Sequence, residues 1–170
     1  VAAQEGRALA RLHDGPSPAE LAAWMWREGG DVTEDVGEGS FARAGVHEAL
    51  AALRAPGGGA GAADMSVEPT RALVAVDVNT GGDGSPAAAL KANLAAAKAL
   101  PRALRLRGLA GQIVIDFAPM TKRDRPRLEQ ALKAAFRADP VETTLIGWTP
   151  LGHFEATRKR ERVPLAEVLP

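Results

Sequence analysis

Short apolar runs of strand length alternate with helix-length repeats between residues 64 and 163, and this alternation constrains the fold more than any other feature of the chain. The expected strands are residues 65–68, 71–78, 112–117 and 141–148. The expected helices are residues 86–107, 125–137 and 154–160, the last of them short. Strands separated by helices predict an α/β fold, with a mixed or partly parallel sheet flanked by helices. Pro101 is expected to kink or restart the first of these helices.

A helical N-terminal segment is expected over residues 1–55, joined by a flexible Gly-rich connection (residues 56–63) to an α/β subdomain (residues 64–163). The expected helices of this segment are residues 2–13, a helix capped by Ser17 and a helix capped by Ser40. Trp24 and Trp26 are interpreted as core residues, with base stacking as the alternative. The Gly-rich connection lacks the Lys-Ser/Thr ending of a nucleotide-binding loop and has no strand before it.

The composition excludes several classes of protein, and the charged residues are unevenly distributed between the two halves of the chain. The chain has no cysteine, which excludes a disulfide framework and a Cys-based zinc site. It shows neither a membrane span nor a signal pattern, so we expect a cytoplasmic protein without a membrane partner. Residues 1–90 hold 6 Lys and Arg against 13 Asp and Glu, whereas residues 91–170 hold 15 against 8. The basic second half indicates either a surface for a polyanion or solvated helix faces.

Two of the expected strands are apolar and end in an aspartate, Asp77 in one and Asp116 in the other. Ligands of α/β sheets bind beyond the carboxyl ends of the strands, so neighbouring strands would bring both carboxylates into one crevice. Two close carboxylates repel each other unless a cation lies between them, and Mg²⁺ prefers such oxygen ligands. Asn79 lies on the same side of its strand as Asp77. The alternative is that each aspartate caps a loop or a helix.

Basic residues follow the second aspartate closely, at Lys122, Arg123, Arg125 and Arg127. A basic rim around a metal-bearing acidic centre is what a nuclease needs, because the rim attracts the phosphate backbone. Residues 158–162 form a second basic run that is either part of this rim or a solvated tail. The histidines at positions 13, 47 and 153 show no pair at ligand spacing, and none is assigned a catalytic role.

Several segments resemble the ribonuclease E/G family in order and spacing, over roughly residues 46–160. The matching segments are Glu68–Leu73 leading into Val76–Thr80, Asn93-Leu94, Leu104–Leu109, Gly111–Phe117, Met120-Thr121 and Gly152–Arg160. The resemblance implies a deoxyribonuclease I-like catalytic subdomain in which Asp77 and Asp116 bind Mg²⁺ (or Mn²⁺) and Asn79 assists. It also implies endonucleolytic cleavage of single-stranded RNA by a metal-activated water, leaving 5′-phosphate and 3′-hydroxyl ends.

The sequence also departs from the family pattern. We find no OB-fold RNA-binding domain, no 5′-end sensing region and, without cysteine, no zinc link between protomers. Thr143 stands near the position of an arginine expected to sense the RNA 5′-phosphate, and the helix motif reads Asn93-Leu94-Ala95. The chain therefore resembles the C-terminal part of a shortened member or a fragment, whose RNA-binding region the full-length protein supplies. The sequence leaves open whether the chain forms a homo-oligomer. The alternative function is a non-catalytic RNA-binding or assembly module that retains the nuclease fold.

Overall fold

The computed structural model describes residues 2–4, 9–11, 35, 37–55 and 64–168, and the chain divides into two compact units, residues 1–45 and 46–170. In the first unit, β1 (Ala2–Gln4) pairs antiparallel with β2 (Leu9–Arg11), and α2 (Ser40–Arg43) follows. The helix expected over residues 2–13 is therefore wrong. Its sequence contains Gly6, and a helix of this length is marginal without an apolar face to pack. The helix expected after Ser17, both tryptophans and the connection at residues 56–63 lie outside the described residues.

The helix expected from Ser40 is interrupted. Gly39, in the left-handed conformation, precedes α2, and a second helix, α3 (Val46–Arg54), begins in the second unit. Gly45 separates the two helices with φ +66°, a conformation that only glycine adopts without strain. The sequence pattern of residues 40–54 is thus divided between two shorter helices.

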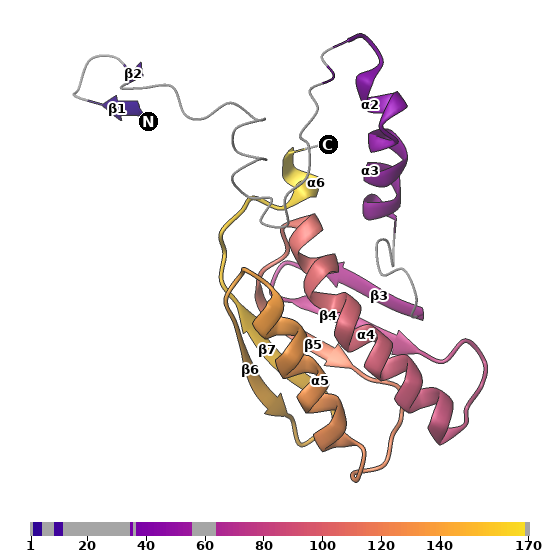
Figure 1. The fold of residues 1–170 in the computed structure, drawn as a ribbon. Coiled ribbons are helices and arrows are strands. Elements are labelled where there is room, and N and C mark those ends of the chain that lie inside the picture. The colour runs from indigo at the N-terminus through magenta and orange to yellow at the C-terminus, as the bar shows by residue number, and fades with distance from the viewer. Residues whose placement is uncertain (1, 5–8, 12–34, 36, 56–63, 169–170) are drawn as a thin grey trace. The chain divides into compact units, whose positions relative to one another are not determined.

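The second unit is built around a five-stranded sheet (Figure 1). Its strands are β3 (Asp64–Pro69), β4 (Val74–Asn79), β5 (Gly111–Asp116), β6 (Thr143–Trp148) and β7 (Phe154–Arg158). They are arranged in the order β3-β4-β5-β7-β6, in which only β4 and β5 are parallel. The predicted α/β fold with a mixed, partly parallel sheet is confirmed.

Strand β7 replaces the short helix expected over residues 154–160, and that expectation is wrong. Phe154, Ala156 and Arg158 are buried while Thr157 between them is exposed, a period of two that suits a strand. The strand is inserted between β5 and β6 and pairs antiparallel with both. Pairing with strands on both sides, the preceding β6 and the distant β5, outweighs the weak local preference of so short a segment.

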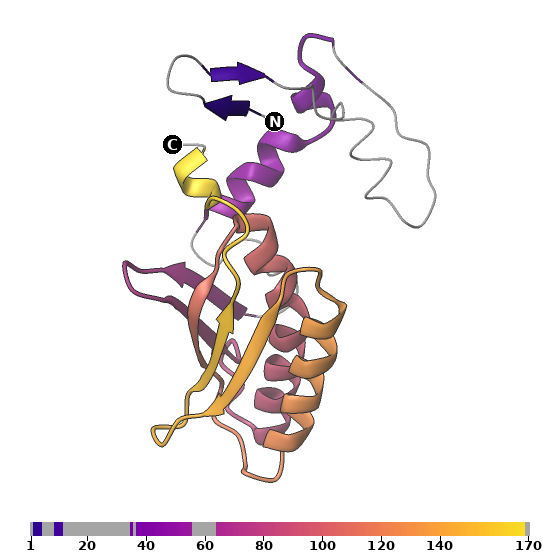
Figure 2. The same ribbon diagram turned by 90° about the vertical axis from the view of Figure 1, so that its left-hand side faces the viewer.

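Two helices cover one face of the sheet, as Figure 2 shows from the side. Helix α4 (Pro86–Arg107) begins after Ser85, whose hydroxyl accepts the Ala88 N–H at 3.2 Å, and ends at Gly108 with φ +65°. It continues through Pro101 as one helix. Helix α5 (Arg125–Ala138) packs beside it, and α6 (Leu165–Val168) is a single short turn near the C-terminus. The core between the helices and the sheet includes Leu100, Leu104, Ile113, Ile115, Leu128, Leu132 and Phe154.

The other face of the sheet carries the alternate side chains of each strand. Val74, Val76 and Val78 of β4 are buried against the helices, so Ala75, Asp77 and Asn79 point the opposite way. On β5, Gln112 and Asp116 lie on this open face and are exposed. Within the described residues, no helix has the length and apolar character needed to cross a lipid bilayer.

Candidate active site

The two aspartates singled out by the sequence end neighbouring parallel strands and are direct register partners. Asp77 of β4 lies opposite Asp116 of β5, and both side chains are exposed on the open face. Neighbouring strands lie about 4.8 Å apart, so two carboxylates on the same face at one register position are close together. The structure therefore brings these two residues to one place.

Within the described part of the chain, the basic side chain that approaches this pair is a histidine, His153. Among the described residues, no Lys or Arg forms an ion pair with Asp77 or Asp116. The side chain of Asp116 is 65% exposed. Asn79 Nδ2 donates a hydrogen bond of 2.6 Å to Asp77 Oδ2, which fixes the orientation of that carboxylate and leaves its other oxygen available. An aspartate that served only as a cap would instead accept from a nearby backbone N–H.

A hard divalent cation suits this donor set. The described residues contain no cluster of three or more His, Cys, Asp or Glu that could enclose a metal ion. Mg²⁺ does not need such an enclosure, because it is usually bound by one or two carboxylates and keeps several waters. Two exposed carboxylates, one of them oriented by an amide, match that requirement.

His153 is the residue that the sequence interpretation missed. Its Nε2 lies 3.9 Å from Asp116 Oδ1, and its side chain is 38% exposed. It immediately precedes β7, whose first residue, Phe154, pairs with Ile115. His153 therefore continues the row of Asp77 and Asp116 onto a third strand. The alternation of apolar and polar residues from Phe154 to Thr157 was the available sequence signal, because it marks the strand that places this histidine.

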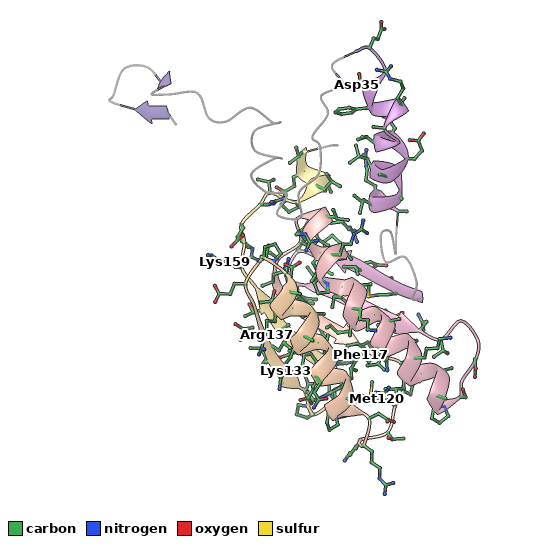
Figure 3. All side chains as sticks on the ribbon, viewed as in Figure 1. Asp35, Phe117, Met120, Lys133, Arg137 and Lys159 are labelled. Carbon is green, nitrogen blue, oxygen red and sulfur yellow. The ribbon has the colours of Figure 1, made fainter. Side chains whose placement is uncertain are left out.

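The segment after Asp116 is held by a buried asparagine of α4. Asn93 is fully buried; its Nδ2 donates to the Ala118 carbonyl and its Oδ1 accepts the Ala118 N–H, both at 2.9 Å. Phe117 and Met120 of the same segment lie beside α4 and α5 (Figure 3) and pack against the core. The side-chain amide thus satisfies both backbone groups of the residue two positions beyond the aspartate.

The loop after β4 is ordered by a second acidic residue. Asp83 Oδ1 accepts the Ser85 N–H at 2.9 Å, directly before α4 begins. Hydrogen bonds from the Ser85 backbone N–H and then the Ser85 hydroxyl lower the pKa of Asp83 below its usual value. This carboxylate therefore acts as a local turn residue and lies in the connection beyond the aspartate pair.

The four predicted RNA-binding residues have three different surroundings. Lys122 and Arg123 are exposed in the connection between β5 and α5, which starts at the carboxyl end of β5. Arg125 stacks on Trp148, with its Cζ 4.2 Å from the ring centroid, and its Nε is buried without a hydrogen-bond partner. Arg127 lines a groove between α4 and α5 on the covered side of the sheet. Trp148 pairs with Phe154, which pairs with Ile115 next to Asp116, so Arg125 also lies at the end of the sheet that carries the aspartates. The structure thus brings Lys122, Arg123 and Arg125 toward that end, and the role of all four residues stays a prediction.

Arg158, the first residue of the second basic run, belongs neither to a rim nor to a solvated tail. It is 3% exposed and donates to Asp139 Oδ1 at 2.7 Å and to Thr143 Oγ1 at 2.8 Å. Arg105 of α4 pairs with the other oxygen of Asp139. Asp139 directly follows α5, and its buried carboxylate therefore connects the end of α5 to the ends of α4 and β7.

Comparison with known proteins identifies the relationship. The model of the "Ribonuclease E/G family" matches residues 46–161, which is more than half of the chain and contains the whole sheet. The chain belongs to the ribonuclease E/G family. The resemblance inferred from the strand-end motifs is thereby confirmed.

Several ribonucleases of this family are similar to the chain over part of their length. Ribonuclease G of Salmonella typhimurium is 39% identical over 110 residues, which cover 62% of this chain and 22% of that protein. Ribonuclease E of Nostoc sp. is 41% identical over 100 residues, or 56% of this chain and 15% of that protein. A ribonuclease E/G-like protein of Guillardia theta is 36% identical over 103 residues, or 58% and 24%. The chain thus spans about a fifth of the length of these ribonucleases.

Proposed function

We propose that residues 64–163 form the catalytic, deoxyribonuclease I-like subdomain of a Mg²⁺-dependent endoribonuclease that cleaves single-stranded RNA in the cytoplasm. The observation that carries the proposal is the register pairing of Asp77 and Asp116, exposed and without a Lys or Arg partner among the described residues, in a member of the ribonuclease E/G family. Two neighbouring carboxylates repel each other, and a bound cation would relieve this repulsion.

Each residue of the site has a role in this proposal. Asp77 and Asp116 would hold the cation, with Mn²⁺ as an alternative to Mg²⁺, and Asn79 would orient the Asp77 carboxylate. When bound, such a cation polarises a phosphoryl oxygen and lowers the pKa of a coordinated water. Lys122 and Arg123 would attract the RNA backbone to the carboxyl end of the sheet, where their charge offsets that of the phosphates.

The test is cleavage of a fluorescent single-stranded RNA by the chain, with Mg²⁺ and with a chelator. We expect cleavage that depends on the metal and is abolished by Asp77→Asn and by Asp116→Asn. Glu142→Gln is the matched control, because it removes an exposed carboxylate at the opposite end of the sheet and should leave cleavage unchanged. Cleavage that survives both Asp→Asn changes would overturn the proposed site.

The alternative of a non-catalytic RNA-binding or assembly module predicts a different result. In that case RNA would bind without being cut, and neither aspartate would affect the outcome. Calorimetric titration of Mg²⁺ and Mn²⁺ separates the two functions further, because uptake that either Asp→Asn change abolishes supports the metal site.

A further inference from the structure

An arginine-lined pocket lies at the end of the sheet opposite the aspartates. It has a volume of about 410 Å³, and its walls include Arg71, Arg160 and Arg162. Arg71 lies in the turn before β4, and the other two follow β7, whose last residue pairs with Gly111. The pocket thus sits at the amino ends of the same two parallel strands whose carboxyl ends carry Asp77 and Asp116.

The three guanidinium groups have no carboxylate partner among the residues that the structure describes. Arg71, Arg160 and Arg162 form no ion pair there, and all three are exposed. Glu161, which lies between the last two in sequence, pairs with Lys159 at 3.5 Å instead. Glu167 also lines the pocket, so its walls carry three positive side chains and one negative side chain. The excess of positive charge suits the pocket to an anion.

The backbone around the pocket is built to hold these side chains. Gly111 has φ +87°, and a Cβ at this position would lie 2.5 Å from Arg160 Nη2. A Cβ on Gly108, with φ +65°, would lie 2.7 Å from the Val163 carbonyl oxygen, so the glycine allows the chain after Arg162 to pass close to the end of α4. The absence of a Cβ therefore leaves room for the Arg160 guanidinium at Gly111, and for the backbone that follows Arg162 at Gly108.

Two further anchors limit the movement of the arginines. Thr70 Oγ1 accepts the Ala72 and Leu73 N–H groups and donates to the Leu73 carbonyl, which closes the turn that presents Arg71. Arg158, two residues before Arg160, is fixed by its buried ion pair with Asp139. Arginines presented from ordered backbone lose less conformational freedom on binding a phosphate than arginines of a mobile tail.

We propose that this pocket, defined by Arg71, Arg160 and Arg162, binds the phosphate backbone of the same RNA strand that reaches the aspartate pair. The proposal rests on the proposed function and adds a second contact to it. Five to six extended residues separate the pocket from the aspartates, a distance of about 16–20 Å along the strands. RNA is a fitting ligand because it carries a regular series of phosphates, of which one lies at the aspartates and another enters the pocket. Arg is suited to such contacts by its planar, bidentate geometry.

The experiment is the salt dependence of RNA binding, measured by fluorescence anisotropy with a labelled single-stranded RNA. Each phosphate of a single-stranded nucleic acid that a protein neutralises adds about 0.7 to the steepness of log K against log salt. The double change Arg160→Ala and Arg162→Ala should therefore reduce the slope by about 1.4 and weaken binding several-fold at low salt. Arg160→Lys with Arg162→Lys retains both charges and should retain most of the slope.

The matched control removes the same charge elsewhere. Lys133→Ala with Arg137→Ala changes two exposed residues of α5 outside the pocket (Figure 3) and should leave the slope nearly unchanged. An unchanged salt slope in the Arg160/Arg162 double Ala variant would overturn the proposal that the pocket binds RNA. A decrease in slope of the same size in the control variant would also overturn it. Thermal melting verifies that each variant is folded.

All titrations are made in chelator-containing buffer without divalent metal, so that the result does not depend on cleavage. If Asp77→Asn abolishes cleavage but retains the salt slope of the unmodified chain, the proposed RNA-binding pocket is supported independently of the cleavage site. If the unmodified chain cleaves RNA as proposed but the Arg160/Arg162 double Ala variant has an unchanged salt slope, the pocket is overturned and the proposed function is retained.

Discussion

Replacement of Asn93 by leucine tests how the core of this fold supports the candidate active site. Leucine has a similar volume but neither donates nor accepts hydrogen bonds, so Asn93→Leu leaves the Ala118 N–H and carbonyl without partners in a buried place. Each unsatisfied buried backbone group costs about 1–3 kcal/mol, and the two together therefore predict a decrease of about 2–6 kcal/mol in the free energy of unfolding. Total stabilities are about 5–15 kcal/mol, so this is a large fraction.

Urea denaturation followed by circular dichroism measures the decrease, because the midpoint falls while the slope with urea stays constant. Hydrogen exchange at the Ala118 amide should also become faster, since its acceptor is gone. Gln112→Leu is the control: it removes an exposed amide of β5 that has no side-chain hydrogen bond within the described residues, and should change stability by less than about 0.5 kcal/mol. A decrease below about 1 kcal/mol in Asn93→Leu would refute the reasoning that the two hydrogen bonds support this segment.

Three further predictions concern ionisable side chains. Without metal, Asp116→Asn should be at least as stable as the unmodified chain in a thermal melt, because it relieves repulsion from Asp77; a clear decrease in Tm would identify a structural cap. Asp139→Asn should lower the unfolding free energy by about 3–5 kcal/mol in urea, because it leaves Arg158 buried without its counter-charge, and a decrease below about 1 kcal/mol contradicts this. His153→Gln should reduce the ratio of Mn²⁺ to Mg²⁺ affinity in calorimetric titrations, because imidazole nitrogen favours transition metals; an unchanged ratio means that this histidine does not contact the ion.

The elements dominated by local sequence signals were predictable. Ser85, Pro86 and Gly108 mark both ends of α4, and the structure places the helix at the expected residues. The apolar runs before Asp77 and Asp116 form neighbouring strands, so the meeting of the two aspartates follows from the parallel crossover through α4. In each of these cases the signal lies within the segment itself.

The misplaced strand β7 depends in part on β5, a partner that is distant in sequence. Residues 154–158 form a strand because β5 and β6 provide hydrogen-bonding edges on both sides, and neither edge can be recognised from the five residues alone. The positions of His153 and Arg158 follow from that strand. Arg158 in particular resembles one of several exposed basic residues until Asp139 is placed against it. A sequence pattern records which side chains alternate, but not which strand they will meet.

The position of β7 in the sheet also has a consequence for the order in which the site can be assembled during translation. Strand β7 comes last among the strands of the five-stranded sheet, yet it lies inside it, between β5 and β6. A nascent chain that has been synthesised only as far as β6 holds both aspartates but leaves the edge of β5 unpaired, and such an edge is open to wrong partners. The sheet is completed, and the histidine joins the aspartates, only after Arg158 has left the ribosome. A chain that ends before that residue would therefore carry both aspartates on a sheet whose β5 edge is still unpaired.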